Sequence, residues 1–213
     1  MAGAGGSPWP LIHAERRALL DDLETAGLGQ DAWRTRSLCT EWTVHQVLGH
    51  MLSTAMMTPT RFLREFASAR FRFDDFSAAG VAAHTSDDPA RTLAAFRAAL
   101  DRTSAPPGPV EAMLGEAVVH PEDIRRPLGL RHVYPEEALV RVADFFKGSN
   151  LLIGAKNRIA GVRLTASDAS WAHGEGPEAS GPLLSLIMVM TGRKPHLDDL
   201  TGEGVSPLRG RIG

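Results

Sequence analysis

The chain has little of what several classes of protein require. Cys39 is the only cysteine among 213 residues, so an intrachain disulfide and a cysteine-built zinc site are both excluded. The formal net charge is −2, which provides no basic surface for nucleic acid or for an anionic membrane. A nucleophile-elbow motif and a phosphate-binding glycine loop ahead of a helix are also missing. We therefore expect a protein that binds neither nucleic acid nor membranes.

The sequence also shows no segment that would direct it into or across a membrane. Its first residues, MAGAGGSPWP, have neither the basic nor the apolar region of a signal peptide. The longest apolar run, residues 183–190, contains Ser185 and is too short to span a bilayer. Together with the single cysteine, these features predict a cytoplasmic protein.

What the sequence does contain is helical periodicity. Hydrophobic residues make up 43% of the chain and charged residues 23%, the balance of a globular protein that is long enough to bury a full core. Apolar residues recur at helical spacing in stretches that start near residues 10, 43, 89 and 109. Each apolar stripe is too wide to leave in water, so these stretches predict an up-down-up-down four-helix bundle. The stretch at residue 43 has the clearest start, because Thr43 and Gln46 fit a capping box.

The segments between these helices are less regular. A further helix is expected from Arg61 to Arg70, after Pro59. Phe71, Phe73 and Phe76 follow without a clear period, which predicts core packing beneath a loop, and residues 78–87 read as an Ala/Gly-rich connection. Pro121 is expected to kink its helix or to start a separate turn.

The last third of the chain has a different texture. A fifth helix is predicted over about 135–147, after which residues 161–166 alternate as a strand and residues 169–173 supply an antiparallel partner. A Gly/Pro-rich piece then leads into an apolar helix over residues 182–191. We expect a mainly α protein with two parts: a helical bundle over residues 1–150 and a small strand-strand-helix region over residues 151–213.

Three ionisable side chains make a candidate metal site. Glu116 and His120 are four residues apart, so on a helix their side chains lie one above the other. His50 lies on the flank of another helix and is the best third ligand. Two imidazoles and one carboxylate make a site with open positions, for which zinc is the default ion, while nickel and iron also fit these ligand types. The ordinary alternative stays open, in which Glu116 and His120 only hydrogen-bond and His50 is a partly exposed histidine.

The residues after His120 allow two interpretations each. Asp123 either accepts a hydrogen bond that orients His120 or pairs with Arg126. Arg125, Arg126 and Arg131 look like a solvated basic face, and alternatively bind a carboxylate, because a guanidinium matches that group with two hydrogen bonds.

Two stretches carry a family resemblance. The segments EWTVHQVLGHM and EAVVHPEDIRRPLG resemble the signature regions of the mycothiol-dependent maleylpyruvate isomerase-like proteins, which belong to the DinB/YfiT-like helical-bundle superfamily. The segment DASWAHGEGPEASGPLLSLIMVMTGR is similar to their short C-terminal region, in place of which the isomerase itself is expected to have a larger domain. The resemblance implies a divalent metal at one end of a four-helix bundle, held by His50, Glu116 and His120.

The resemblance also implies a function. In such proteins a low-molecular-weight thiol, mycothiol or a similar one, acts at the metal in isomerisation or in S-transfer to an electrophile. We therefore expect a metal-dependent thiol transferase or isomerase whose partners are a thiol and an electrophilic small molecule, with a homodimer left open. The alternative is a non-catalytic DinB-like module that binds a ligand or a partner and whose metal site is structural or vestigial.

Overall fold

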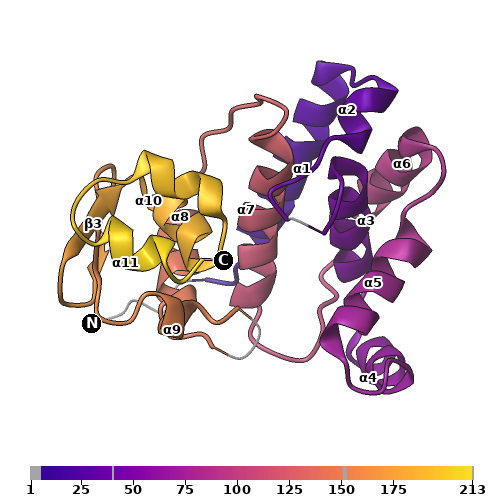
Figure 1. Ribbon diagram of the computed structural model, residues 1–213. Helices are drawn as coiled ribbons and strands as arrows, with labels where there is room; N and C mark the ends of the chain where they lie inside the picture. Colours follow the sequence, from indigo (N-terminus) through magenta and orange to yellow (C-terminus); the bar gives the residue numbers. More distant parts are fainter. Residues whose placement is uncertain (1–5, 40, 151–152, 213) are drawn as a thin grey trace. The chain divides into compact units, whose positions relative to one another are not determined.

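The computed structural model describes residues 6–39, 41–150 and 153–212. It is mainly helical and divides into two compact units, Met1–His132 and Val133–Gly213. The helices of the first unit are α1 (Trp9–Ala26), α2 (Gln30–Arg34), α3 (Val44–Ala55), α4 (Pro59–Ser68), α5 (Phe73–His84), α6 (Pro89–Ala99) and α7 (Glu111–Arg125) (Figure 1). Among the residues described, none of the helices has the length and apolar character needed to cross a bilayer.

The core of the first unit lies between the four helices that the apolar periodicity predicted. Helix α3 contacts α6 and α7, and α1 contacts the same two helices. Figure 1 shows α3, α5 and α6 side by side. The four predicted packing faces are thus confirmed, and burying each large aliphatic side chain contributes about 1.5–3 kcal/mol. The core residues are Leu19, Leu20, Leu23, Trp33, Val44, Val47, Leu48, Met51, Leu52, Ala55, Phe96, Ala99, Leu100 and Ile124.

The predicted capping box fixes the start of α3. The hydroxyl of Thr43 accepts a hydrogen bond from the backbone N–H of Gln46 at 3.3 Å, and the Gln46 side chain accepts one from the N–H of Thr43 at 2.9 Å. These two bonds satisfy N–H groups that have no partner within the helix. Helix α3 therefore begins at a defined residue, which sets the direction of every later side chain on it.

Two predictions for the connecting segments are wrong. Residues 73–84, expected to be a loop and an Ala/Gly-rich connection, form helix α5, and Phe71 and Phe73 are 71% and 42% exposed rather than part of the core. The small side chains that suggested a connection instead let α5 lie against α3. Helix α7 continues through Pro121, so of the two alternatives for that residue the structure excludes the separate turn.

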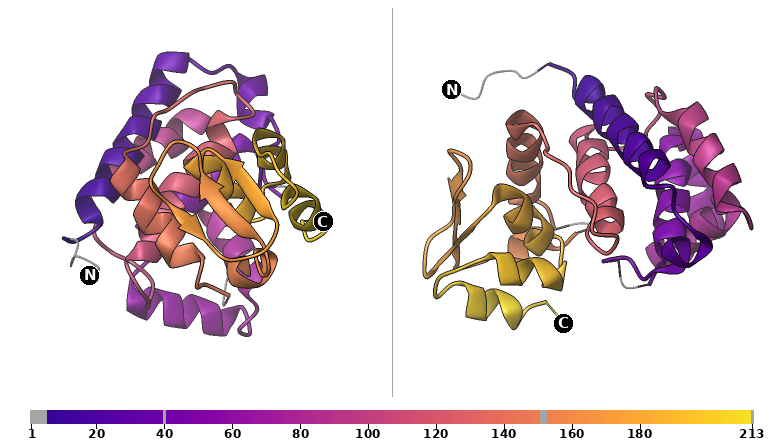
Figure 2. Two further views of the ribbon diagram at one scale, coloured as in Figure 1. Left: turned by 90° about the vertical axis from the view of Figure 1, so that its left-hand side faces the viewer. Right: turned by 90° about the horizontal axis from the view of Figure 1, so that it is seen from above.

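The second unit combines helices with a small sheet. Its elements are α8 (Glu136–Phe146), α9 (Ala155–Arg158), β1 (Arg163–Ala166), β2 (Ala172–His173), β3 (Glu178–Gly181), α10 (Leu183–Met190), the 3-10 helix η1 (Lys194–Asp199) and α11 (Val205–Arg209). The strand order is β2-β1-β3, with β2 antiparallel and β3 parallel to β1. Figure 2 shows this sheet in orange in its left view. Helix α8 packs against α10, so the structure divides the chain one helix earlier than the boundary expected at residue 150.

Strand β3 is an element that the sequence did not reveal. Its residues, EASG, include none of the β-branched or aromatic side chains that mark strands. The chain reaches β3 by crossing close to the start of β1, where a Cβ on Gly174 would lie 2.4 Å from the carbonyl oxygen of Val162. The glycines of the Gly/Pro-rich piece are therefore what allow the crossing.

The close approach of α3 and the end of α5 gives a test of the packing. A Cβ on Gly49 would lie 2.1 Å from Thr85 Oγ1 and 3.3 Å from the Thr85 backbone nitrogen. Gly49→Ala gains about 1 kcal/mol of helix propensity, but overpacking costs about 1–3 kcal/mol. We expect a net loss of about 1 kcal/mol in the free energy of unfolding, measured with urea.

The matched control removes the obstructing oxygen. Thr85 Oγ1 is buried and makes no hydrogen bond within the described structure, so Thr85→Ala alone should cost little. The double variant Gly49→Ala/Thr85→Ala should recover part of the loss. A Gly49→Ala protein as stable as the wild type would show that α3 and α5 do not approach this closely.

Candidate metal centre

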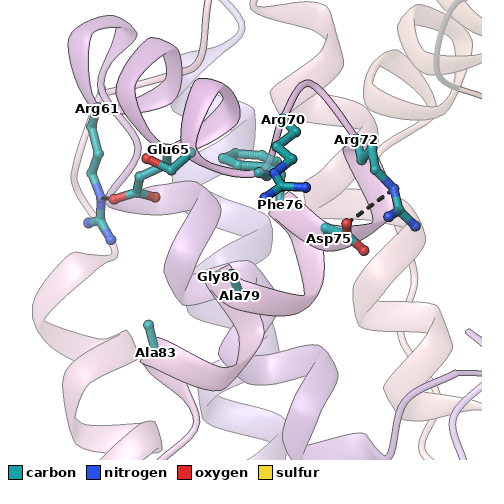
Figure 3. A pocket seen from close by; sticks show the side chains of 11 residues that line it. Arg61, Glu65, Arg70, Arg72, Asp75, Phe76, Ala79, Gly80 and Ala83 are labelled. Carbon is teal, nitrogen blue, oxygen red and sulfur yellow. Dashed lines mark hydrogen bonds and ion pairs between the residues drawn. The ribbon is translucent and has the colours of Figure 1, made fainter.

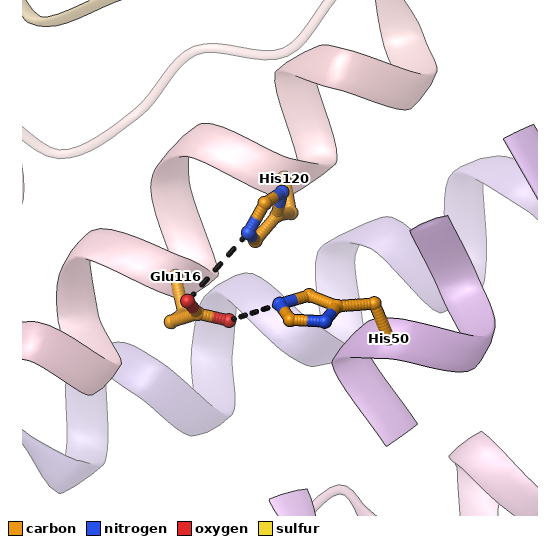
Figure 4. A group of neighbouring side chains, drawn as sticks. All are labelled: His50, Glu116 and His120. Carbon is orange, nitrogen blue, oxygen red and sulfur yellow. Dashed lines mark ion pairs between the residues drawn. The ribbon is translucent and has the colours of Figure 1, made fainter. Parts of the chain in front are cut away.

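Three side chains from two helices converge in the first unit. His50 comes from α3, and Glu116 and His120 come from α7. One nitrogen or oxygen atom from each lies within 4.8 Å of the others. The Nε2 atom of His50 is 3.2 Å from Glu116 Oε2, and that of His120 is 3.6 Å from Glu116 Oε1 (Figure 4). The structure thus brings together the three residues that helix spacing and the family resemblance had selected.

His50 is held between an aromatic ring that precedes α3 and an imidazole ring from α7. The ring of Trp42 lies over the imidazole with 4.8 Å between ring centroids, and the ring of His120 meets it edge-on at 4.7 Å. The side chain of His50 is only 15% exposed. Aromatic contact on two sides leaves Nε2 as the ring atom that faces Glu116.

His120 is oriented by a buried carboxylate. Its Nδ1 atom lies 2.9 Å from Oδ2 of Asp123, one turn further along α7, and the Asp123 side chain has no exposed surface. A neutral imidazole whose Nδ1–H is held in this way presents the lone pair of Nε2 toward Glu116. Of the two interpretations of Asp123, the structure supports the one in which it orients His120.

The electrostatics of the cluster favour opposite charges on neighbouring groups. Burial disfavours ionisation of Glu116, but the two histidines hold the pKa of its carboxyl well below the ordinary value. Burial by itself would lower the pKa of His120, yet the carboxylates of Glu116 and Asp123 raise it to about 9. In the metal-free protein a proton on His120 therefore compensates the Glu116 charge at neutral pH.

The donor set fits a divalent ion. Donors about 2.05 Å from a tetrahedral zinc ion are about 3.3 Å apart. One Glu116 oxygen lies 3.2 Å from His50 Nε2, the other lies 3.6 Å from His120 Nε2, and one donor atom from each of the three residues lies within 4.8 Å of the others. Oε2 of Glu116 is buried, and its described polar neighbour is Nε2 of His50 at 3.2 Å, two atoms that one cation could bind together. Two imidazoles and a carboxylate leave at least one tetrahedral position open.

Arg16 of α1 is a neighbour of this cluster that the sequence did not indicate as functional. It is only 3% exposed, and its Nη1 donates to the carbonyl of Arg102 at 3.1 Å. Burial lowers the pKa of its guanidinium to about 10, although the negative charge of Glu116 acts to raise that pKa. Arg16 therefore remains charged at neutral pH. Its signal in the sequence was a charge inside an apolar helix face.

The predicted basic face after His120 is wrong for Arg125. This side chain has no exposed surface, and both Nε and Nη2 lie 2.7 Å from Oδ2 of Asp22 on α1. The carboxylate that Arg125 binds is thus one of the protein's own. It ties α7 to α1 and leaves Arg126 and Arg131 nearer the surface.

One hollow of the first unit does not coincide with the cluster. A groove of about 520 Å³ lies between α4 and α5, and its lining includes Arg61, Arg70, Arg72 and Phe76. In Figure 3 the Arg61–Glu65 and Arg72–Asp75 pairs stand on either side of it. Because none of its lining residues belongs to the His50–Glu116–His120 cluster, volume alone would have pointed away from the chemistry.

Comparison with known proteins shows which family part of this chain resembles. Residues 12–108 match the family model of the mycothiol maleylpyruvate isomerase N-terminal domain. This stretch belongs to that family. The matched part of the isomerase-family domain includes His50 and ends before Glu116 and His120. Among curated protein sequences, none matches the chain.

Two solved structures share the fold. Both are crystal structures of the mycothiol-dependent maleylpyruvate isomerase, one of them a point mutant. The mutant has a TM-score of 0.59 at 14% identity and the other 0.58 at 13%, and each comparison covers 92% of this chain and 93% of the other. The expectation that the isomerase has a larger C-terminal domain is therefore wrong, because the two chains match over nearly their whole lengths.

The charge pairing of His120 predicts how the metal-free protein responds to pH. Its pKa is raised from 6.5 to about 9, so the imidazolium contributes stability that is fully present below about pH 6.5 and is lost as the pH rises through about 9. We expect the free energy of unfolding of chelator-treated protein to fall over this interval in urea titrations. His120→Gln should flatten the decline, whereas His173→Gln, on β2, should retain it. A wild-type protein with constant stability across this range would contradict the charge pairing.

Proposed function

We propose that the protein is a metal-dependent enzyme that uses a low-molecular-weight thiol, mycothiol or a similar one, on an electrophilic small molecule. The reaction is S-transfer to the electrophile or its isomerisation. The observation that carries the proposal is the convergence of two imidazoles and one carboxylate, whose donor atoms lie within 4.8 Å of one another. Three such ligands would leave a tetrahedral ion with one open position. The isomerase-family domain over residues 12–108 supports the choice of a thiol.

The proposal gives each residue of the cluster a role. Nε2 of His50, Nε2 of His120 and the carboxylate of Glu116 hold the ion, for which zinc is the first choice. A bound zinc ion supplies the positive charge that lowers the pKa of a coordinated thiol. Asp123 keeps the proton on Nδ1 of His120, while the proton on Nε2 must leave before that atom acts as a ligand. The Trp42 ring, whose centroid lies 4.8 Å from that of His50, covers one side of this ligand.

The first test concerns the ligands. Replacing His50, Glu116 or His120 singly by Ala removes one of three donors, so the content of tightly bound metal should fall sharply, as measured by elemental analysis. His45→Ala is the matched control, because His45 lies on the same helix and bonds Thr92 instead. If the His50→Ala protein retains a full equivalent of metal, the choice of the third ligand is wrong.

The second test concerns the thiol. A thiol that binds at the metal loses its proton, so binding should release about one proton. This release appears as a binding heat that varies with the ionisation enthalpy of the buffer in calorimetry of mycothiol or a simpler thiol. Equal thiol affinity in the metal-loaded and chelator-treated proteins would contradict the proposal.

One observation favours a second candidate function. The charge of Glu116 is compensated without a metal ion, because protonated His120 already lies next to it. This is compatible with a non-catalytic module whose metal site is vestigial and whose role is to bind a ligand or a second copy of the chain. Thiol binding that needs the metal separates the two candidates. Either function fits a reducing cytoplasm, which is also part of our proposal.

A further inference from the structure

We propose that Arg16 is a positioning residue that makes the open coordination position select an anionic ligand, a thiolate, over a neutral one. This inference rests on the proposed function and extends it to a residue outside the ligand set. Arg16 acts through the charge of its guanidinium and does not itself coordinate the ion.

The location of Arg16 supports this role. Arg16 and Glu116 line one small cavity of about 10 Å³, whose other walls are Met51, Thr54, Met113 and Ala117. This volume is about the room that one water molecule needs. The guanidinium is fixed on one side by the carbonyl of Arg102, so its charge cannot swing away from the site. With mostly apolar walls and 3% exposure, that charge is screened far less than one at the surface.

The charges around the site give the reason for selecting an anion. Glu116 and Asp123 each contribute one negative charge, Arg16 contributes one positive charge, and the ligating imidazoles are neutral. A divalent ion leaves the site with a net charge of +1, and a bound thiolate brings it to zero. Without Arg16 the same thiolate complex would carry a net charge of −1 in a poorly hydrated space, which is costly. A neutral ligand gains nothing comparable from Arg16.

The same charge has the opposite effect on the metal. A guanidinium near Glu116 repels a divalent cation, so neutralising Arg16 should leave the metal affinity unchanged or raise it. The thiolate affinity should fall. A residue that only supports the packing of α1 would instead weaken both when replaced. The sign of the two changes therefore separates the electrostatic role from a structural one.

The experiment uses the full-length, zinc-loaded protein and three variants of Arg16. Arg16→Gln and Arg16→Met remove the charge, and the unbranched Met side chain suits the cavity walls formed by Met51 and Met113. Arg16→Lys keeps the charge. The probes are 2-mercaptoethanol, which binds as a thiolate of net charge −1, and imidazole, a neutral ligand. Zinc affinity is measured by competition with a chelator, and thermal unfolding checks the fold.

We expect both neutral variants to bind 2-mercaptoethanol at least about tenfold more weakly, with imidazole and zinc affinity unchanged or higher and with thiol affinity restored in Arg16→Lys. Unchanged thiol affinity in the neutral variants, or equal losses for thiol, imidazole and zinc, would overturn the inference. So would unfolding of both neutral variants where the Lys variant folds. A wild-type protein that holds no zinc or no thiol would instead refute the proposed function, so the two failures are distinguishable.

Discussion

The candidate site depends on the contact between one carboxylate and two imidazoles. Glu116 of α7 faces His50 of α3 and His120 one turn further along its own helix, in a place where an isolated negative charge would be unfavourable. A carboxylate there must be compensated by a cation, whether that is a proton on His120 or a metal ion. Neighbouring groups hold the two imidazoles in place. Asp123 fixes the orientation of His120, and the capping box fixes where α3 begins and therefore where His50 lies on it.

Much of this could be predicted from the sequence, because it depends on local rules. The spacing of Glu116 and His120, the Thr43–Gln46 capping box and the four apolar stripes each follow from helix geometry alone. His50 was harder to place, since its partners lie on another helix. It was selected because its position on the flank of α3 suits a ligand between helices, and because the family resemblance includes the segment that contains it.

What the sequence did not reveal depends on contacts between distant segments. Arg16 was not selected as a functional residue, because nothing in the local sequence shows that its guanidinium donates to the distant carbonyl of Arg102. Arg125 looked solvated because its partner Asp22 is about a hundred positions away. Helix α5 was missed because its few buried positions, Gly80 and Val81, give almost no apolar stripe. Strand β3 was missed because its residues, EASG, include no β-branched or aromatic side chain and stand in a Gly/Pro-rich piece.

The proton held by His120 also bears on the choice between a structural and a functional metal. A structural ion is needed where the ligands would otherwise repel one another or leave charges unpaired. Here the metal-free cluster pairs its own charges, since Glu116 is ionised and His120 is protonated at neutral pH. The metal-free cluster therefore compensates its own charges, and binding of a divalent ion would replace the single charge of the proton on His120 and raise the net charge of the site by one. A metal ion held by these three ligands would have an open coordination position, which the proton on His120 does not provide. A structural role would not require this position, whereas a thiol-dependent reaction would use it.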